Sequence, residues 1–154
     1  PLIQKEFSRI MSLKDGSKKM SKSELSDLSR INLTDDKDQI INKIKKAKTD
    51  PLPMPKNSKE LEGRPEAQNL LGIYASLSNL TLELSVDKFA GKNFSEFKDA
   101  LSELLVNEIL PISKEIKKLL KDQSYLDSIL LDGVERANKI ASQKIKNIKE
   151  IVGF

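Results

Sequence analysis

Apolar side chains recur at helical spacing through most of residues 94–150 of this 154-residue chain. Because they return every three or four residues, they predict two long amphipathic helices, over 94–121 and 123–150. Pro111 lies inside the first helix, so we expect a kink or a local break there. The second helix is expected to belong to a compact helical domain through an apolar face that comprises Leu126, Ile129, Leu130, Val134, Ala137, Ile140, Ala141, Ile145 and Ile148.

Three shorter helices are expected before these two, over about residues 35–48, 65–79 and 81–90. Thr34 is the expected N-cap of the first, and Pro65 suits the first turn of the second. The intervening segment is rich in proline and should be an ordered connector, anchored by Leu52, Met54 and Leu61. The predicted fold class is therefore mainly α, with a helical bundle domain over residues 31–154.

The first thirty residues have a different character. Residues 8–13 predict a short strand, and the Asp-Gly pair that follows predicts a turn at 14–17. The next segment, 18–23, reads Lys-Lys-Met-Ser-Lys-Ser and combines three ammonium groups with two hydroxyls. Such a loop suits a polyanion, because its cations can meet phosphate oxygens and its small residues let backbone N–H groups approach. The alternative is a solvated connection between a strand and a helix.

Composition excludes several classes of site. The chain has no histidine and no cysteine, which removes the usual general base, the usual zinc ligands, disulfides and histidine-dependent nucleophiles. No apolar run is long enough to span a membrane, and the first residues have no signal-peptide pattern, so we expect a cytoplasmic protein without membrane contact. The net charge of +4 does not by itself indicate nucleic-acid binding.

The first predicted helix carries a second basic cluster near its C-terminal end. Its lysines either form a solvated face that complements the helix dipole or contact an RNA backbone. The candidate RNA-binding residues are Lys43, Lys45, Lys46 and Lys48.

A series of short segments in a fixed order resembles the C-terminal part of bacterial tryptophanyl-tRNA synthetases, which are class I aminoacyl-tRNA synthetases. The first is the KMSKS signature at residues 19–23, preceded by Arg-Ile-Met-Ser-Leu at 9–13. Further segments lie at 29–36 (SRINLTDD), 44–50 (IKKAKTD), 63–71 (GRPEAQNLL) and 132–137 (DGVERA). The resemblance covers nearly the whole chain.

The resemblance implies that residues 1–30 are a remnant of a Rossmann-like α/β catalytic domain and that the helical domain recognises the tRNA anticodon. It implies a cytoplasmic, homodimeric ligase that activates L-tryptophan with ATP and Mg²⁺ and then transfers the amino acid to tRNA(Trp). ATP with Mg²⁺ would be a substrate of this enzyme and not a prosthetic group. No metal site and no zinc are expected in this chain. Lys22 is the implied catalytic cation, with Lys19 assisting. The implied ATP-binding residues are Ile10, Lys19, Met20, Ser21, Lys22 and Ser23.

Because this enzyme class also uses a histidine-containing motif, we expect the other half of the active site to lie outside this sequence, and the chain alone to be inactive. The start at Pro1 agrees with that expectation. Three alternatives stay open: a non-catalytic basic module that binds tRNA, a helical protein–protein adaptor, and the closely related tyrosyl-tRNA synthetase.

Overall fold

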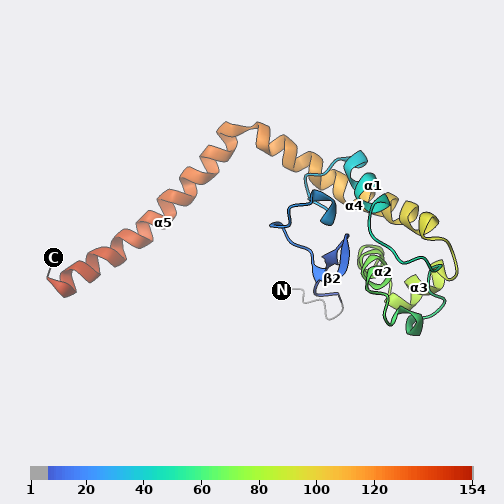
Figure 1. Ribbon diagram of the computed structural model, residues 1–154. Helices are drawn as coiled ribbons and strands as arrows, with labels where there is room; N and C mark the ends of the chain where they lie inside the picture. Colours follow the sequence, from blue (N-terminus) through green and yellow to red (C-terminus); the bar gives the residue numbers. More distant parts are fainter. Residues whose placement is uncertain (1–6, 154) are drawn as a thin grey trace. The chain divides into compact units, whose positions relative to one another are not determined.

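The computed structural model describes residues 7–153 and is mainly helical (Figure 1). The chain divides into two compact units, Pro1–Ser113 and Lys114–Phe154, which are considered separately below. In chain order the elements are β1 (Met11–Ser12), β2 (Asp15–Lys19), the 3₁₀ turn η1 (Asp27–Ser29), α1 (Lys37–Lys45), the 3₁₀ turn η2 (Ser58–Leu61), α2 (Pro65–Ser78), α3 (Leu82–Phe89), α4 (Phe94–Lys121) and α5 (Gln123–Val152). The predicted helices are therefore confirmed in number and order.

The predicted loop at 18–23 is partly wrong, because the chain turns earlier than expected. Leu13 and Lys14 form the turn, and β2 pairs antiparallel with β1, with Met11 opposite Lys19. Gly16 thus lies on a strand rather than in a turn. Its backbone packs so closely on the start of α2 that a Cβ atom there would lie 2.6 Å from the carbonyl carbon of Pro65. Glycine is needed here for contact with a neighbouring helix, which an Asp-Gly pair in a sequence does not reveal.

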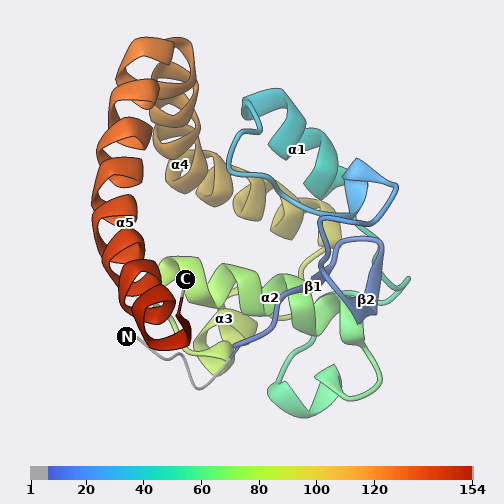
Figure 2. The same ribbon diagram turned by 90° about the vertical axis from the view of Figure 1, so that its left-hand side faces the viewer.

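The hairpin formed by β1 and β2 lies against α2, as Figure 2 shows. Its two antiparallel strands make no open parallel sheet, so the Rossmann-like character of residues 1–30 stays a prediction. The residues on both sides of position 30 pack into the same compact unit. The functional division at residue 30 is likewise still a prediction.

Helix α1 begins later than predicted. Asp36, not Thr34, is the N-cap: its carboxylate accepts from the Gln39 backbone N–H at 2.9 Å, and the Gln39 side chain accepts from the Asp36 N–H at 2.9 Å. This reciprocal capping box satisfies two backbone donors, whereas a cap at Thr34 would have Lys37 three residues later, and a lysine side chain cannot accept the second hydrogen bond. The preceding carboxylate, Asp35, is consequently outside the helix and takes a different role.

The core of the first unit lies between α1, α2, α3 and the first half of α4. Tyr74, Phe89 and Phe97 form an aromatic cluster in which Phe89 packs edge-on against both others, with ring centroids 4.9 Å apart in each pair. Met54 and Leu61 are buried and fix the proline-rich connector, as predicted. Leu52 is 55% exposed, so its predicted anchoring role is wrong.

In the second unit, α4 ends at Lys121, and the Asp122 side chain caps α5 by accepting from the Tyr125 N–H at 3.0 Å. Helix α5 has no buried residue, so nothing within its own unit covers the apolar face, and the packing of that face in a compact domain stays a prediction. Helical periodicity shows that a helix is amphipathic but not what covers its apolar side. The helical run of α4 continues through Pro111, so a local break does not occur there, and the alternative of a kink stays a prediction. Within residues 7–153, no helix is long and apolar enough to cross a membrane.

Candidate functional site

The β1–β2 hairpin carries the first part of the signature segment, and α2 holds it in place. Asn69 of α2 lies 58 residues away in sequence, and its side chain bonds both backbone groups of Met11, accepting from the N–H and donating to the carbonyl at 2.9 Å each. Glu66, one turn earlier on α2, pairs with Lys48 at 2.8 Å. The Lys48 hydrogen bond, helped by the Gly16 N–H, holds the pKa of Glu66 below its usual value.

The predicted ATP-binding residues surround the exit of this hairpin. Ile10 is half-buried, and its carbonyl accepts from the Met20 N–H at 3.0 Å. Met20 itself packs against the core. Ser21 is half-buried and residues 22–25 are exposed, and the Ser21 and Ser23 hydroxyls lie 2.9 Å apart.

Two adjoining hollows lie at this surface. The first is lined by Met20, Ser21 and Lys22 together with residues 30–34. The second is lined by Lys19 and Ser21 among others. Five of the six predicted residues, 19–23, lie in one surface region because they are consecutive in the sequence. The sixth, Ile10, contacts this segment through its backbone carbonyl. Ser23 lines neither hollow and joins the group through Ser21 alone.

The two predicted catalytic cations are exposed, and neither Lys19 nor Lys22 forms an ion pair within residues 7–153. Their neighbour Lys18 differs, since its ammonium lies 3.3 Å from Asp15 on the same strand. An ammonium group without a carboxylate partner is available to a phosphate, because no ion pair has to be broken first. Lys19 and Lys22 meet this requirement, and Lys18 does not.

The four candidate RNA-binding lysines do not share one face. Lys43 points into the protein and is only 3% exposed, with its ammonium between Asp27 and Asp35. The prediction that it lies on the exposed basic surface is wrong. Lys45, Lys46 and Lys48 are exposed, but Lys48 is already paired with Glu66. Of the four candidates, only Lys45 and Lys46 are therefore exposed and without an ion pair in the described part of the chain.

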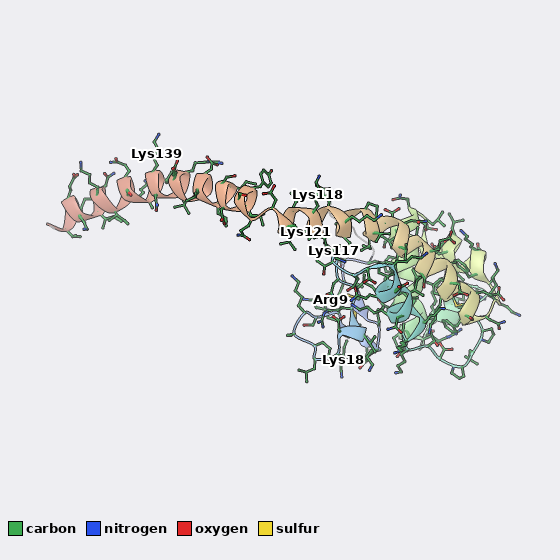
Figure 3. All side chains as sticks on the ribbon, turned by 90° about the horizontal axis from the view of Figure 1, so that it is seen from above. Arg9, Lys18, Lys117, Lys118, Lys121 and Lys139 are labelled. Atoms are coloured by element: carbon green, nitrogen blue, oxygen red, sulfur yellow. The ribbon has the colours of Figure 1, made fainter. Side chains whose placement is uncertain are left out.

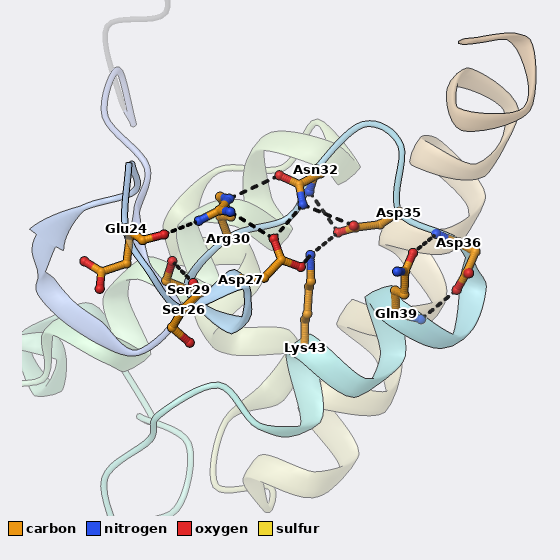
Figure 4. A network of polar contacts seen from close by, with 10 residues as sticks. All are labelled: Glu24, Ser26, Asp27, Ser29, Arg30, Asn32, Asp35, Asp36, Gln39 and Lys43. Atoms are coloured by element: carbon orange, nitrogen blue, oxygen red, sulfur yellow. Dashed lines mark hydrogen bonds and ion pairs between the residues drawn. The ribbon is translucent and has the colours of Figure 1, made fainter. Parts of the chain in front are cut away.

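A polar network that the sequence does not reveal lies directly after the signature segment (Figure 4). Lys43 lies 2.7 Å from Asp27 and 2.6 Å from Asp35. Asp27 also pairs with Arg30 at 3.0 Å and accepts from the Asn32 side chain at 3.0 Å. Arg30, Asn32 and Asp35 belong to the motif SRINLTDD, but only the fold brings Lys43 to them.

Another basic cluster, not predicted as a site from the sequence, lies at the end of α4. Figure 3 shows the side chains of Lys117, Lys118 and Lys121 extending outward from the helix. Together with Lys114, they follow the spacing i, i+3, i+4 and i+7, so they share one helical face. Lys118 pairs with Glu115 at 3.4 Å.

Clusters of potential metal ligands were sought among the described side chains. Across residues 7–153, no group of three or more carboxylate, histidine or cysteine side chains gathers to form a metal site. The donors that Mg²⁺ prefers are oxygens.

Comparison with known proteins identifies the family of this chain. The family model described as tRNA synthetases class I (W and Y) matches residues 2–125. The chain belongs to this family of class I aminoacyl-tRNA synthetases. Among named relatives, the tryptophan–tRNA ligase of Agrobacterium fabrum is 53% identical over all 154 residues, and that of Brucella melitensis is 51% identical. The crystal structure of tryptophanyl-tRNA synthetase from Mycoplasma pneumoniae matches 98% of the chain at 26% identity with a TM-score of 0.71.

The match covers only part of each relative. The chain spans 44% of the length of the A. fabrum protein, 43% of the B. melitensis protein and 45% of the M. pneumoniae chain. Less than half of each relative is therefore represented by these 154 residues.

Proposed function

We propose that this chain provides the signature-loop portion of a tryptophan–tRNA ligase, which activates L-tryptophan with ATP and then transfers it to tRNA(Trp). The observation that carries the proposal is the pair of exposed ammonium groups of Lys19 and Lys22, which have no ion-pair partner among the described residues and lie beside the two hollows, in a chain of this family. The relatives named above are tryptophan–tRNA ligases, which favours tryptophan over tyrosine. By the same resemblance, the proposed enzyme is a cytoplasmic homodimer.

The proposed mechanism is electrostatic. When tryptophan attacks the α-phosphate of ATP, negative charge builds on the departing pyrophosphate. A cation that reaches the phosphates only when the loop closes stabilises this charge more strongly in the transition state than in the bound substrate. We assign this role to Lys22 and a supporting role to Lys19.

The remaining predicted residues would hold the nucleotide. Ser21 and Ser23 offer hydroxyl groups to the phosphates, and half-buried Met20 and Ile10 offer apolar contact to the adenosine. None of these side chains is a general base, and none is needed, because the reaction is promoted by charge stabilisation and by positioning. The accompanying Mg²⁺, when bound, would neutralise phosphate charge.

A hybrid enzyme tests the proposal. In this hybrid, the present chain replaces the matching 154 residues of the A. fabrum ligase, and tryptophan-dependent ATP–pyrophosphate exchange is measured. By analogy with the loss of one oxyanion donor, Lys22→Ala should slow the exchange by about 2.7–4 kcal/mol in activation free energy. The matched control is Lys18→Ala, which removes a neighbouring exposed lysine that is already paired with Asp15. Equal rates for Lys22→Ala and the parent would refute the assignment.

The exposed lysines of α1 support a second, narrower proposal. Lys45 and Lys46 are free of ion pairs within the described residues and lie at the end of a helix whose backbone is capped by Lys98, which donates to the Lys45 carbonyl at 3.1 Å. We propose that Lys45 and Lys46, rather than Lys43, contact the phosphate backbone of tRNA. A non-catalytic RNA-binding module remains the alternative if the hybrid enzyme is inactive.

A further inference from the structure

The signature segment is fixed at two points close to each other in sequence. At its entry, the Met20 N–H donates to the Ile10 carbonyl at 3.0 Å. At its exit, the Glu24 carbonyl accepts from the Arg30 guanidinium at 2.8 Å. Between these points lie residues 21–23, whose side-chain hydrogen bonds in the structure join only Ser21 and Ser23 to each other. Lys22 is therefore at the centre of a short free span between two anchors.

The exit anchor is itself held by a branched set of contacts (Figure 4). Arg30 is 17% exposed, and its guanidinium reaches the Glu24 carbonyl, the Asp27 carboxylate at 3.0 Å and the Asn32 side chain at 3.3 Å. Arginine makes these contacts with three separate nitrogen atoms in a planar fork, whereas a lysine has one nitrogen for all of them. Arg30 thus links the backbone after Ser23 to Asp27.

Asp27 connects this anchor to the protein core. Its second carboxylate oxygen lies 2.7 Å from the buried ammonium of Lys43 on α1. The side chains of Lys43 and Asp35 are 3% and 4% exposed, so their charges are held in a site from which water is largely excluded. A buried charge cannot leave its partner without a large desolvation penalty. Lys43 therefore holds a fixed position, and its ion pair with Asp27 restrains that carboxylate.

We propose that Arg30, held by Asp27 and Lys43, is a positioning residue that sets the place of Lys22. The inference rests on the proposed function above. Two anchors a few residues apart leave the span few conformations, so little entropy is lost when Lys22 closes on the phosphates. Loss of the Arg30 hydrogen bond to the Glu24 carbonyl would let residues 21–23 adopt more conformations. The Lys22 ammonium would then lie less often where negative charge develops on the phosphates. Arg30 acts only through Lys22 and does not touch the substrate.

The experiment is a double-variant cycle in the hybrid enzyme, with ATP–pyrophosphate exchange as the readout. Arg30→Gln should lower kcat by about tenfold to a hundredfold, the cost expected for misplacing a catalytic group by about 1 Å, while KM for tryptophan stays near the parent value. In a Lys22→Ala background, Arg30→Gln should have almost no further effect, because the group that it positions is gone. Arg30→Lys should behave like Arg30→Gln despite its retained charge.

The control is Lys37→Met, which removes an exposed cation from the first turn of α1 without touching the network. If Arg30→Gln lowers kcat by the same factor with and without Lys22, its effect is general destabilisation and the inference is wrong. Should Arg30→Gln fail to fold, Asp27→Asn replaces it, because the buried Lys43–Asp35 pair then remains intact. An unchanged kcat in either variant also overturns the inference. Failure of the proposed function gives a different result, in which Lys22→Ala itself has no effect.

Discussion

The side chain of Asn69 takes the place of a β-strand partner for Met11. It accepts from the Met11 N–H and donates to the Met11 carbonyl, each at 2.9 Å, as a neighbouring strand would. The β1–β2 hairpin has only two strands, so this amide supplies the hydrogen bonds that a third strand would otherwise make. Through Met11, α2 thereby determines where the strand carrying Lys19 lies.

Replacement of Asn69 by alanine should destabilise the first unit by about 1–3 kcal/mol, because two backbone groups of Met11 are then left without partners in a partly buried site. The measurement is urea unfolding of the 154-residue chain, together with hydrogen exchange at the Met11 amide, which should become faster. Gln68→Ala is the matched control, since Gln68 is exposed on the same helix. Equal stability of the two variants would show that the amide contributes nothing.

The buried pair of Lys43 and Asp35 predicts that loss of the cation alone costs more stability than loss of both charges. Lys43→Met should cost about 3–5 kcal/mol, because it leaves the buried Asp35 carboxylate without its cation. Addition of Asp35→Asn to Lys43→Met should recover part of this stability by removing the uncompensated charge. Thermal or chemical unfolding of Lys43→Met, Asp35→Asn and the double variant measures the coupling. A double variant that is less stable than Lys43→Met alone would contradict this account.

Asp27 gives the network a pH dependence. Hydrogen bonds from Lys43 first, and from Asn32 next, hold the pKa of Asp27 below the ordinary value of 3.8. The stability that its ionisation adds is therefore fully present above pH 3.8 and disappears as the pH falls through the lower folded-state pKa. Carbon-detected NMR titration should show this lowered pKa, and Asn32→Ala should raise it. An Asp27 whose pKa in the parent chain is at or above 3.8 would contradict the prediction.

Gly16 and Gly133 should respond to alanine in opposite directions. A Cβ at Gly16 would lie 2.6 Å from backbone atoms of both Pro65 and Glu66, so Gly16→Ala should cost about 1–3 kcal/mol. A Cβ at Gly133 would meet nothing within 4 Å, so Gly133→Ala should stabilise α5 by up to about 1 kcal/mol. Denaturant unfolding tests the first change, and hydrogen exchange along α5 tests the second. Faster exchange at residues 130–137 in Gly133→Ala would contradict the expected stabilisation of α5.

The structural features that can be predicted from the sequence are those that depend on residues close together in the chain. The start of α2 at Pro65 and its end at Asn79 follow from a proline at the first turn and a residue that adopts the left-handed conformation, with φ of 55°. The bounds of α4 follow from its periodic apolar stripe. In the candidate site, the segment around Lys22 is recognisable because its charges and small residues are adjacent in sequence.

The remaining features depend on contacts between distant residues. Lys43 resembles its neighbours Lys45 and Lys46 in the sequence, and only the fold places it against two carboxylates. The N-cap is different, because its signal is local: Asp36, unlike Thr34 and Asp35, is followed three residues later by a glutamine, which is the spacing of a capping box. Asn69, in turn, has an ordinary place in a helical pattern, and its contact with Met11 spans 58 residues.

The proposed RNA contact of α1 can be separated from a general effect of charge. Lys45→Glu with Lys46→Glu should weaken tRNA binding by the 154-residue chain and reduce its salt dependence, by about 0.7–0.9 in the slope of log K against log salt for each phosphate that is no longer bound. The control, Lys117→Glu with Lys121→Glu, changes the net charge equally on the exposed end of α4. Filter binding over a range of salt concentrations measures both. Because long-range attraction responds to net charge while direct contacts respond to position, equal weakening in the two double variants would refute a specific role for Lys45 and Lys46.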